Sequence, residues 1–183
     1  LPYDHLDYPL TRKNFFGDLT TVLHPWKDTA DITKVTKETT NFDLPTADQL
    51  DKLHEPYFKG IDQYVADQNK KLGRRVIRIV PVGQAVLALR RKVIAGELPG
   101  VSKQSELFQD NLGHPSDEIR ALAGYCHFIV IHQKDPRSTP LPLFPFGRRD
   151  HPFKQDTNLI LQEIAWKAVT EHPLSGFYQG KAN

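Results

Sequence analysis

The sequence predicts a mixed α/β fold, and three features of the chain indicate it. Residues 76–82 (VIRIVPV) form a near-continuous, β-branched apolar run, which is typical of a strand buried in a parallel sheet. Gly83 follows directly, and residues 84–95 show apolar residues at helical spacing. Because another helical pattern precedes the run, the order is helix, strand, glycine turn and helix, as in α/β crossover units.

The first 45 residues are expected to contribute an arm and one strand. Residues 1–18 show neither helical nor strand periodicity, so we predict an extended N-terminal arm on the surface. The β-branched run 19–23 should form a short strand that stops at His24-Pro25-Trp26, because proline cannot donate to a sheet ladder. Residues 27–45 are rich in Thr, Asp and Lys, which indicates a polar loop.

A long helix is predicted between Thr46 and Gly73. Thr46 and Gln49 have the spacing of a capping box, in which each side chain bonds the other residue's backbone N–H. Pro56 interrupts the pattern, so either the helix kinks there or a second helix starts there. The apolar residues that recur at helical spacing are Leu50, Leu53, Tyr57, Ile61, Tyr64 and Val65.

Two further helices are predicted toward the C-terminus. Ser116 is a good N-cap for the first, and Thr157 should cap the second, which is expected to end near His172-Pro173. Residues 134–153 between them are rich in proline and should form an irregular strap. The first of these helices should bury a stripe formed by Ile119, Leu122, Ala123, Cys126, Ile129 and Val130.

Length and charge favour one globular domain. A chain of 183 residues can bury roughly 70% of its unfolded surface in one core. We divide the chain into the arm (1–18), an α/β core (19–133), and a strap with a C-terminal helix (134–183) packed on the same domain. The 24 basic and 22 acidic residues give a net charge of +2, which argues against nucleic-acid binding.

Other function classes are excluded by what the chain lacks. No apolar run approaches the roughly 20 residues that span a bilayer, so we expect no transmembrane segment. Cys126 is the single cysteine, which excludes an internal disulfide and a cysteine-built zinc site, and we predict neither a metal nor a cofactor.

The chain contains no methionine, so we expect the natural polypeptide to begin upstream of Leu1. The compartment is undetermined, although export from a bacterium would suit a hydrolase.

The loop 107–116 is the most informative candidate for chemistry. It places Asp110, Gly113 and His114 just before a predicted helix. A carboxylate that fixes the tautomer of a histidine lets the other ring nitrogen take a proton from a hydroxyl nucleophile. From the residues alone two interpretations stay open: His114 is a general base, or it caps or packs at the start of the helix.

The stretch Asp110–Ser116 resembles the last sequence block of the bacterial SGNH (GDSL-like) ester hydrolases. Within residues 80–100, the segments VPVGQA, LR and GELPG resemble the strand and helix that precede this block, and Leu19–Trp26 resembles a middle strand. The likeness is loose over residues 19–132 and best over 76–132. It implies a three-layer α/β/α sandwich (SGNH/flavodoxin-like) with a short parallel sheet, incomplete at its N-terminus.

The resemblance also assigns roles to particular residues. His114 would act as general base and then acid, with Asp110 orienting its imidazole. The family spaces these residues as Asp-x-x-His, whereas three residues separate them here, and Asn111 stands at the usual interval. Either Asp110 reaches the ring through a bulged loop, or Asn111 orients it more weakly. His24 and Trp26 would line the pocket, or would instead form a structural aromatic corner.

The nucleophilic serine of the family has no counterpart in this chain. The family carries it in a Gly-Asp-Ser block after the first strand, and residues 15–20 (FFGDLT) look like that block without its serine. Either the block is degenerate in a pseudoenzyme, or the true block lies upstream of Leu1. We favour the second interpretation, because a doubly wound sheet needs more βα units between nucleophile and histidine than this chain supplies.

The expected function is therefore that of a serine ester hydrolase whose nucleophile lies upstream of this chain. Its substrate would be a small acyl ester, such as an acetyl ester of a carbohydrate. The alternative is a catalytically inactive structural or accessory subunit of a larger assembly. Such a subunit would hold a protein partner through the arm (1–18) and residues 134–153.

Overall fold

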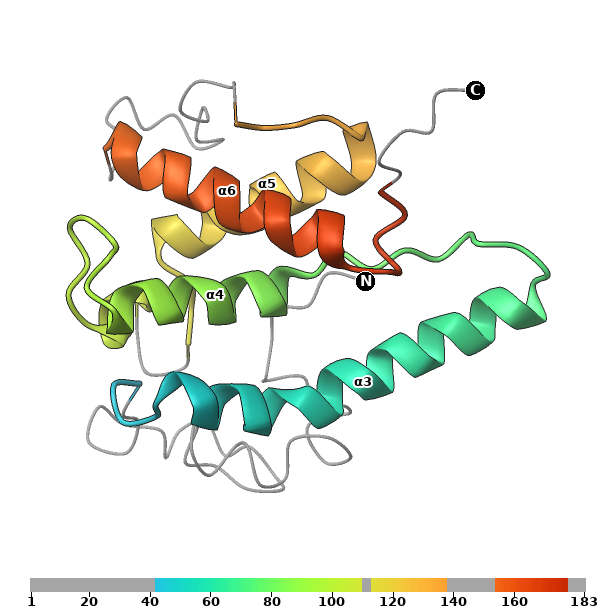
Figure 1. Ribbon diagram of the computed structural model, residues 1–183, viewed down its shortest axis with the longest axis horizontal. Helices are drawn as coiled ribbons and strands as arrows, with labels where there is room; N and C mark the ends of the chain where they lie inside the picture. Colours follow the sequence, from blue (N-terminus) through green and yellow to red (C-terminus); the bar gives the residue numbers. More distant parts are fainter. Residues whose placement is uncertain (1–41, 110–112, 138–153, 178–183) are drawn as a thin grey trace.

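The described part of the protein is helical and contains no sheet. The computed structural model describes residues 42–109, 113–137 and 154–177 (Figure 1). Within these ranges isolated bridges occur, such as that between Phe108 and Pro115, but no strand. The elements are α3 (Ala47–Lys71), α4 (Val82–Ile94), the short 3-10 helix η2 (Gln104–Leu107), α5 (Asp117–His132) and α6 (Gln155–Glu171).

The predicted strand at residues 76–82 is wrong, and so is the three-layer α/β/α sandwich. The run forms no regular structure through Ile79, whose N–H donates to the carbonyl of Leu174 beyond α6 (2.9 Å) rather than to a neighbouring strand. Val80 packs into the helical core. Helix α4 already begins at Val82, so the run ends in a helical turn. A short buried apolar run fits a strand or the start of a buried helix equally well, and here the second holds.

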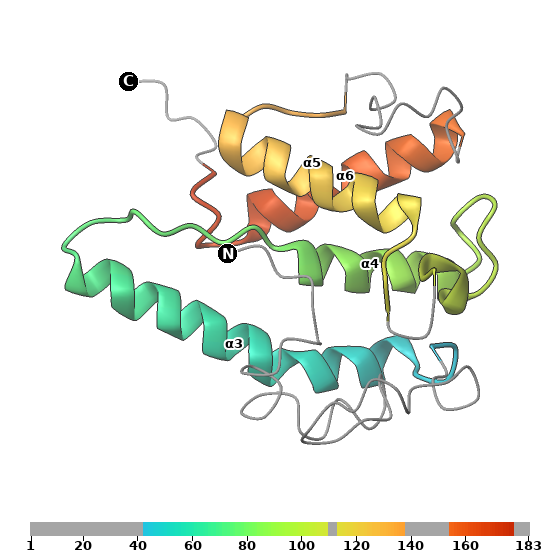
Figure 2. The same cartoon turned by 180° about the vertical axis from the view of Figure 1, so that it is seen from behind.

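Helices α4, α5 and α6 enclose the main core (Figures 1 and 2). α5 packs along α6, and α4 lies against both. Each fully buried aliphatic side chain contributes about 1.5–3 kcal/mol to folding, so these helices hold most of the hydrophobic stabilisation among the described residues. The largest buried side chains of this core are Leu89 on α4, Leu107 on η2, Leu122 and Ile129 on α5, and Leu161 and Val169 on α6.

Helix α5 follows the sequence prediction closely. Ser116 occupies the N-cap position, but its side chain makes no capping bond, since the hydroxyl donates to Glu118. The predicted stripe is buried except for Ala123, which is half-buried. Cys126 has no exposed surface, and this burial raises the pKa of its thiol to about 12, because the thiolate form is disfavoured away from water. The interpretation of Cys126 as a small buried hydrophobic residue is confirmed.

Helix α3 is one helix through Pro56, and no second helix starts there. The predicted capping box is present: the N–H of Thr46 donates to Oε1 of Gln49 (2.9 Å), and the N–H of Gln49 donates to Oγ1 of Thr46 (3.3 Å). α3 makes its main helix contact with α4, and its C-terminal half extends beyond the end of α4 in both views. Just past the helix, Gly73 adopts φ of +65°, which a glycine tolerates without strain.

One further prediction, the helix cap at Thr157, is wrong, and several others concern residues that the structure does not describe. Thr157 does not cap α6, since the helix begins at Gln155 and the Thr157 hydroxyl donates to the carbonyl of Pro99 (3.1 Å). The arm (1–18), the short strand (19–23) and residues 138–153 of the strap lie outside the described residues. Among the helices that are described, none combines the length and the apolar character needed to cross a bilayer.

Candidate functional site

The residues predicted to be catalytic are not brought together in the described part of the chain. His114 is described, and it is exposed on the loop between η2 and α5. Asp110 and Asn111, its two candidate orienting residues, lie outside the described residues, as do the candidate pocket residues His24 and Trp26. The proposed triad therefore stays a prediction.

The loop that carries His114 is closed at its base by the backbone. The N–H of Gln109 donates to the carbonyl of His114 (2.7 Å), and the N–H of Ser116 donates to the carbonyl of Leu107 (2.9 Å). Gly113, with φ of +89°, lets the chain turn directly before the histidine. These bonds hold the exposed imidazole close to the N-terminus of α5.

The serine hydroxyls whose donor bonds are described are committed to acidic side chains. Ser116 donates to Glu118 (2.6 Å), Ser102 to Glu106 (3.1 Å) and Ser105 to Asp43 (2.7 Å). None of these bonds reaches an imidazole. Within the described ranges, His, Cys, Asp and Glu side chains also form no group of three or more that could hold a metal ion.

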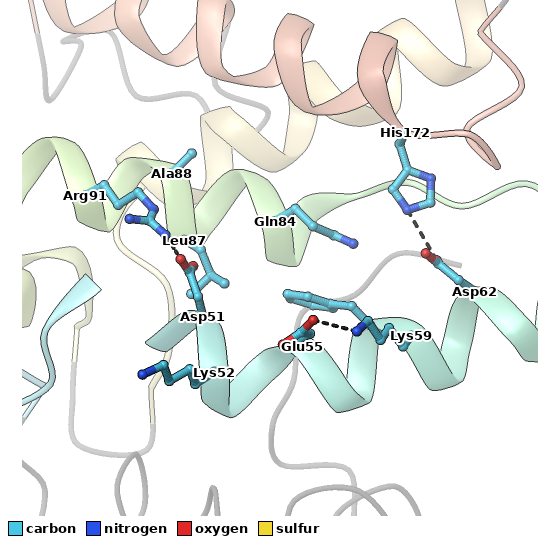
Figure 3. Close-up of a pocket in the computed structure, with 11 residues that line it drawn as sticks. Asp51, Lys52, Glu55, Lys59, Asp62, Gln84, Leu87, Ala88, Arg91 and His172 are labelled. Atoms are coloured by element: carbon cyan, nitrogen blue, oxygen red, sulfur yellow. Dashed lines mark ion pairs between the residues drawn. The ribbon is translucent and has the colours of Figure 1, made fainter. Parts of the chain in front are cut away.

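A groove between α3 and α4 is the candidate functional site (Figure 3). Its volume is about 410 Å³, which falls within the range of ligand-binding clefts. Its apolar lining consists of Phe58 from α3 with Leu87 and Ala88 from α4. The other lining residues are polar or charged: Asp51, Lys52, Glu55, Lys59, Asp62, Gln84, Arg91 and His172.

One ion pair and one histidine–carboxylate contact join the two sides of the groove at its ends. At one end, Arg91 of α4 pairs with Asp51 of α3 (Figure 3). At the other end, Nε2 of His172, just past α6, lies 3.3 Å from Oδ1 of Asp62 on α3. The partly exposed Arg91–Asp51 pair contributes about 0–1 kcal/mol, so it positions the helices more than it stabilises the fold.

The imidazole of His172 lies between the backbone and α3. The N–H of Leu174 donates to Nδ1 (3.2 Å), which leaves the proton of the neutral ring on Nε2, facing Asp62. The side chain is only 7% exposed, and this burial lowers the pKa of His172 below its ordinary value, although Asp62 opposes the shift. The ring is therefore neutral near pH 7, and it lies at the end of the groove beside Asp62.

Gln84 supplies side-chain hydrogen-bonding groups that none of the described residues uses. The residue is half-buried on α4, and its amide points toward the space between His172 and Lys59 (Figure 3). This side-chain amide makes no hydrogen bond to any of the described residues. Lys59 instead pairs with Glu55 one turn before it (2.6 Å), a bond that lowers the pKa of the Glu55 carboxyl. The groove thus combines an apolar lining with an uncommitted amide.

Sequence reasoning missed this site. It treated Gln84 only as the start of a helical pattern and His172 only as the end of one. The spacing of Glu55 and Lys59, four residues apart, is a readable signal of an exposed helical face. No local signal shows which helix packs beside that face, so the groove could not be found without the tertiary structure.

Comparison with known proteins found no matching protein family, no matching curated protein and no matching solved structure. The described residues define an all-helical domain with a groove between two of its helices. The α/β architecture implied by the resemblance to SGNH hydrolases does not describe them.

Proposed function

We propose that this chain is a non-catalytic helical subunit that binds a partner protein by accepting a short peptide segment in the α3–α4 groove. The side-chain amide of Gln84, which the described residues leave unbonded beside an apolar lining, is the observation that carries this proposal. A primary amide offers a donor and an acceptor together, which is the complement of one peptide group. The apolar lining would take a side chain from the same segment, as helical grooves do in other peptide complexes.

The charges of the groove favour a neutral segment over a small ion. Three acidic and three basic residues line the groove, so with a neutral His172 its formal charges cancel. Arg91 is paired with Asp51, and Lys59 with Glu55. A lining of balanced and mostly paired charges has little net field with which to concentrate small ions of one sign.

The proposal is tested by selecting short random peptides displayed on phage against the immobilised protein. Selected peptides are then measured on two variants, Gln84→Leu and Ala88→Arg. Gln84→Leu removes the amide, and Ala88→Arg fills the groove from its half-buried wall. We expect each variant to weaken peptide binding at least tenfold, because a lost buried hydrogen bond or a blocked site costs on the order of 1.4 kcal/mol or more.

The matched control is Ala66→Arg, which places the same side chain on an exposed position of α3 away from the groove lining. This variant should bind the selected peptides as the unchanged protein does, and circular dichroism should show all variants equally helical. If no peptide is enriched, or if enriched peptides bind Gln84→Leu and Ala88→Arg normally, the groove is not a peptide site.

A second candidate function is ester hydrolysis with His114 as general base. The exposure of His114 on a loop closed by two backbone hydrogen bonds favours it. The test compares hydrolysis of p-nitrophenyl acetate by the unchanged protein, by His114→Ala, and by the exposed-histidine control His132→Ala. We expect turnover to be lost only in His114→Ala. Equal rates in all three proteins would remove His114 from any such reaction.

A further inference from the structure

The turn that follows α3 carries an unusual concentration of positive charge. Lys70, Lys71, Arg74 and Arg75 are all exposed, and no acidic residue occurs between Gln68 and Arg78. None of these four cations pairs with a carboxylate of the described residues. We call residues 70–76, which contain them, the basic tip.

The basic run at residues 90–92 differs from the basic tip. Arg90 is 3% exposed, and it donates to the Gln104 side chain and to the carbonyl of Phe42 (2.8 Å each). Arg91 pairs with Asp51, and Lys92 pairs with Glu97. The charged groups of residues 90–92 are therefore bonded within the fold. Those of the basic tip pair with no carboxylate of the described residues, so they can face a partner.

Asn69 holds the basic tip in one conformation. It is 7% exposed, and its Oδ1 accepts from the N–H groups of Val76 and Ile77, each at 2.9 Å. Its Nδ2 donates to the carbonyl of Ile77, also at 2.9 Å. Because these bonds already order the turn, little conformational entropy would be lost when it binds.

Two aliphatic side chains are exposed on the same turn. Leu72 is 55% exposed and Val76 is 47% exposed. The turn lies at the end of the part of α3 that extends beyond α4 (Figures 1 and 2). A protruding turn that shows aliphatic side chains among cations can meet a broad, flat surface without interference from the rest of the described domain.

We propose that the basic tip docks on an anionic membrane surface. The four cations would meet the anionic headgroups, while Leu72 and Val76 would enter the boundary between headgroups and acyl chains. A nucleic acid would also attract the cations, but it has no apolar layer for the two aliphatic side chains. The basic tip shares no residue with the groove lining, so this proposal is independent of the proposed function.

The test is co-sedimentation of the full chain with phosphatidylcholine vesicles that do or do not contain phosphatidylserine. We expect binding only to the anionic vesicles, and weaker binding at high salt, which screens charges over a few ångströms. Each basic residue near such a surface contributes about fivefold in affinity. Lys70→Glu/Arg74→Glu should therefore bind at least about 25-fold more weakly.

The matched control is Lys134→Glu/Lys154→Glu, which makes the same change in net charge at two exposed lysines outside the basic tip. It should retain most of the binding. Leu72→Ser/Val76→Ser should weaken binding to vesicles while leaving binding to a single-stranded oligonucleotide unchanged.

Three results would overturn the proposal. The first is no binding to anionic vesicles. The second is equal loss in the control variant, which would show that net charge alone is responsible. The third is oligonucleotide binding that depends on the four cations while vesicle binding is insensitive to Leu72→Ser/Val76→Ser, which would make the basic tip a general polyanion site.

Discussion

Between α5 and α6 the contact is made by side chains with no exposed surface, such as Leu122 and Leu161, whereas α3 meets α4 differently. There the apolar contact is a small cluster of Leu50, Leu87 and the half-buried Phe58, supplemented by charged pairs beside an open groove. Dispersion and hydrophobic burial do not depend on ionic strength in the way that exposed ion pairs do. One domain thus contains a fully buried core between α5 and α6 and a more open, partly polar contact between α3 and α4.

The contrast shows where a binding function can be placed. A groove that must admit a partner cannot also be filled by the protein's own side chains, so it lies at the weaker helix contact. Elements of low local stability are the ones that ligands use in many proteins. The three predictions below test whether the two regions differ in this way.

The largest effect is expected in the core. Leu161→Ala should lower the free energy of unfolding by about 2–5 kcal/mol, because it leaves a cavity among side chains that cannot collapse into it. Urea denaturation followed by circular dichroism measures this loss. Leu159→Ala, on the same helix but 45% exposed, is the control and should change stability by less than about 0.5 kcal/mol. Equal effects of the two substitutions would contradict the assignment of the core.

The second effect is a pH dependence that originates on α3. His54 is 4% exposed, and burial lowers its pKa to about 4, with the charge of Arg90 acting in the same direction and the bond to the Leu50 carbonyl opposing it. The unfolded chain takes up this proton near pH 6.5, before the folded chain does. Stability should therefore be complete above pH 6.5 and fall by up to about 3 kcal/mol as the pH drops toward 4.

Unfolding measured in urea at several pH values checks this window. His54→Gln cannot take up a proton, so it should remove the part of the pH dependence that His54 contributes between pH 6.5 and 4, whereas the part from His172, whose pKa burial also lowers, should remain. The control His132→Gln changes an exposed histidine and should leave the dependence in place. A dependence that survives unchanged in His54→Gln would assign it to other groups.

The smallest effect is expected at the groove. Asp51→Asn removes the charge that pairs with Arg91, and it should cost no more than about 1 kcal/mol, since both side chains are more than two-fifths exposed. The cost should shrink further in high salt. Leu50→Ala, on the same helix but 1% exposed, is the comparison and should cost more at every salt concentration. A large, salt-independent loss in Asp51→Asn would mean that the groove is as rigid as the core.

The parts of the fold that were predicted correctly are those determined by local sequence. The capping box of Thr46 and Gln49, the N-cap at Ser116 and the apolar stripe of α5 all depend on residues within a few positions of each other. Residues 76–82 could not be assigned in this way. Their β-branched character suits a strand, and only the bond from the N–H of Ile79 to the carbonyl of Leu174, far along the chain, shows that this donor is used outside a sheet.

The candidate site was less accessible to sequence reasoning than the fold. The segment of His114 lies directly before α5, as predicted, but Asp110 and Asn111, either of which would orient its ring, lie outside the described residues. Gln84 and His172 are distant in sequence, and both line the groove because the end of α6 lies beside α3. The spacing of residues along the chain does not predict this proximity.

The sealed thiol of Cys126 makes the protein its own reporter of core opening. As the single cysteine of the chain, it has no exposed surface in the native state, and its raised pKa keeps it protonated and unreactive. A maleimide or disulfide reagent could modify it only during excursions that separate α5 from its neighbours. The rate of that modification would therefore measure how often the core opens around Cys126, without any introduced label.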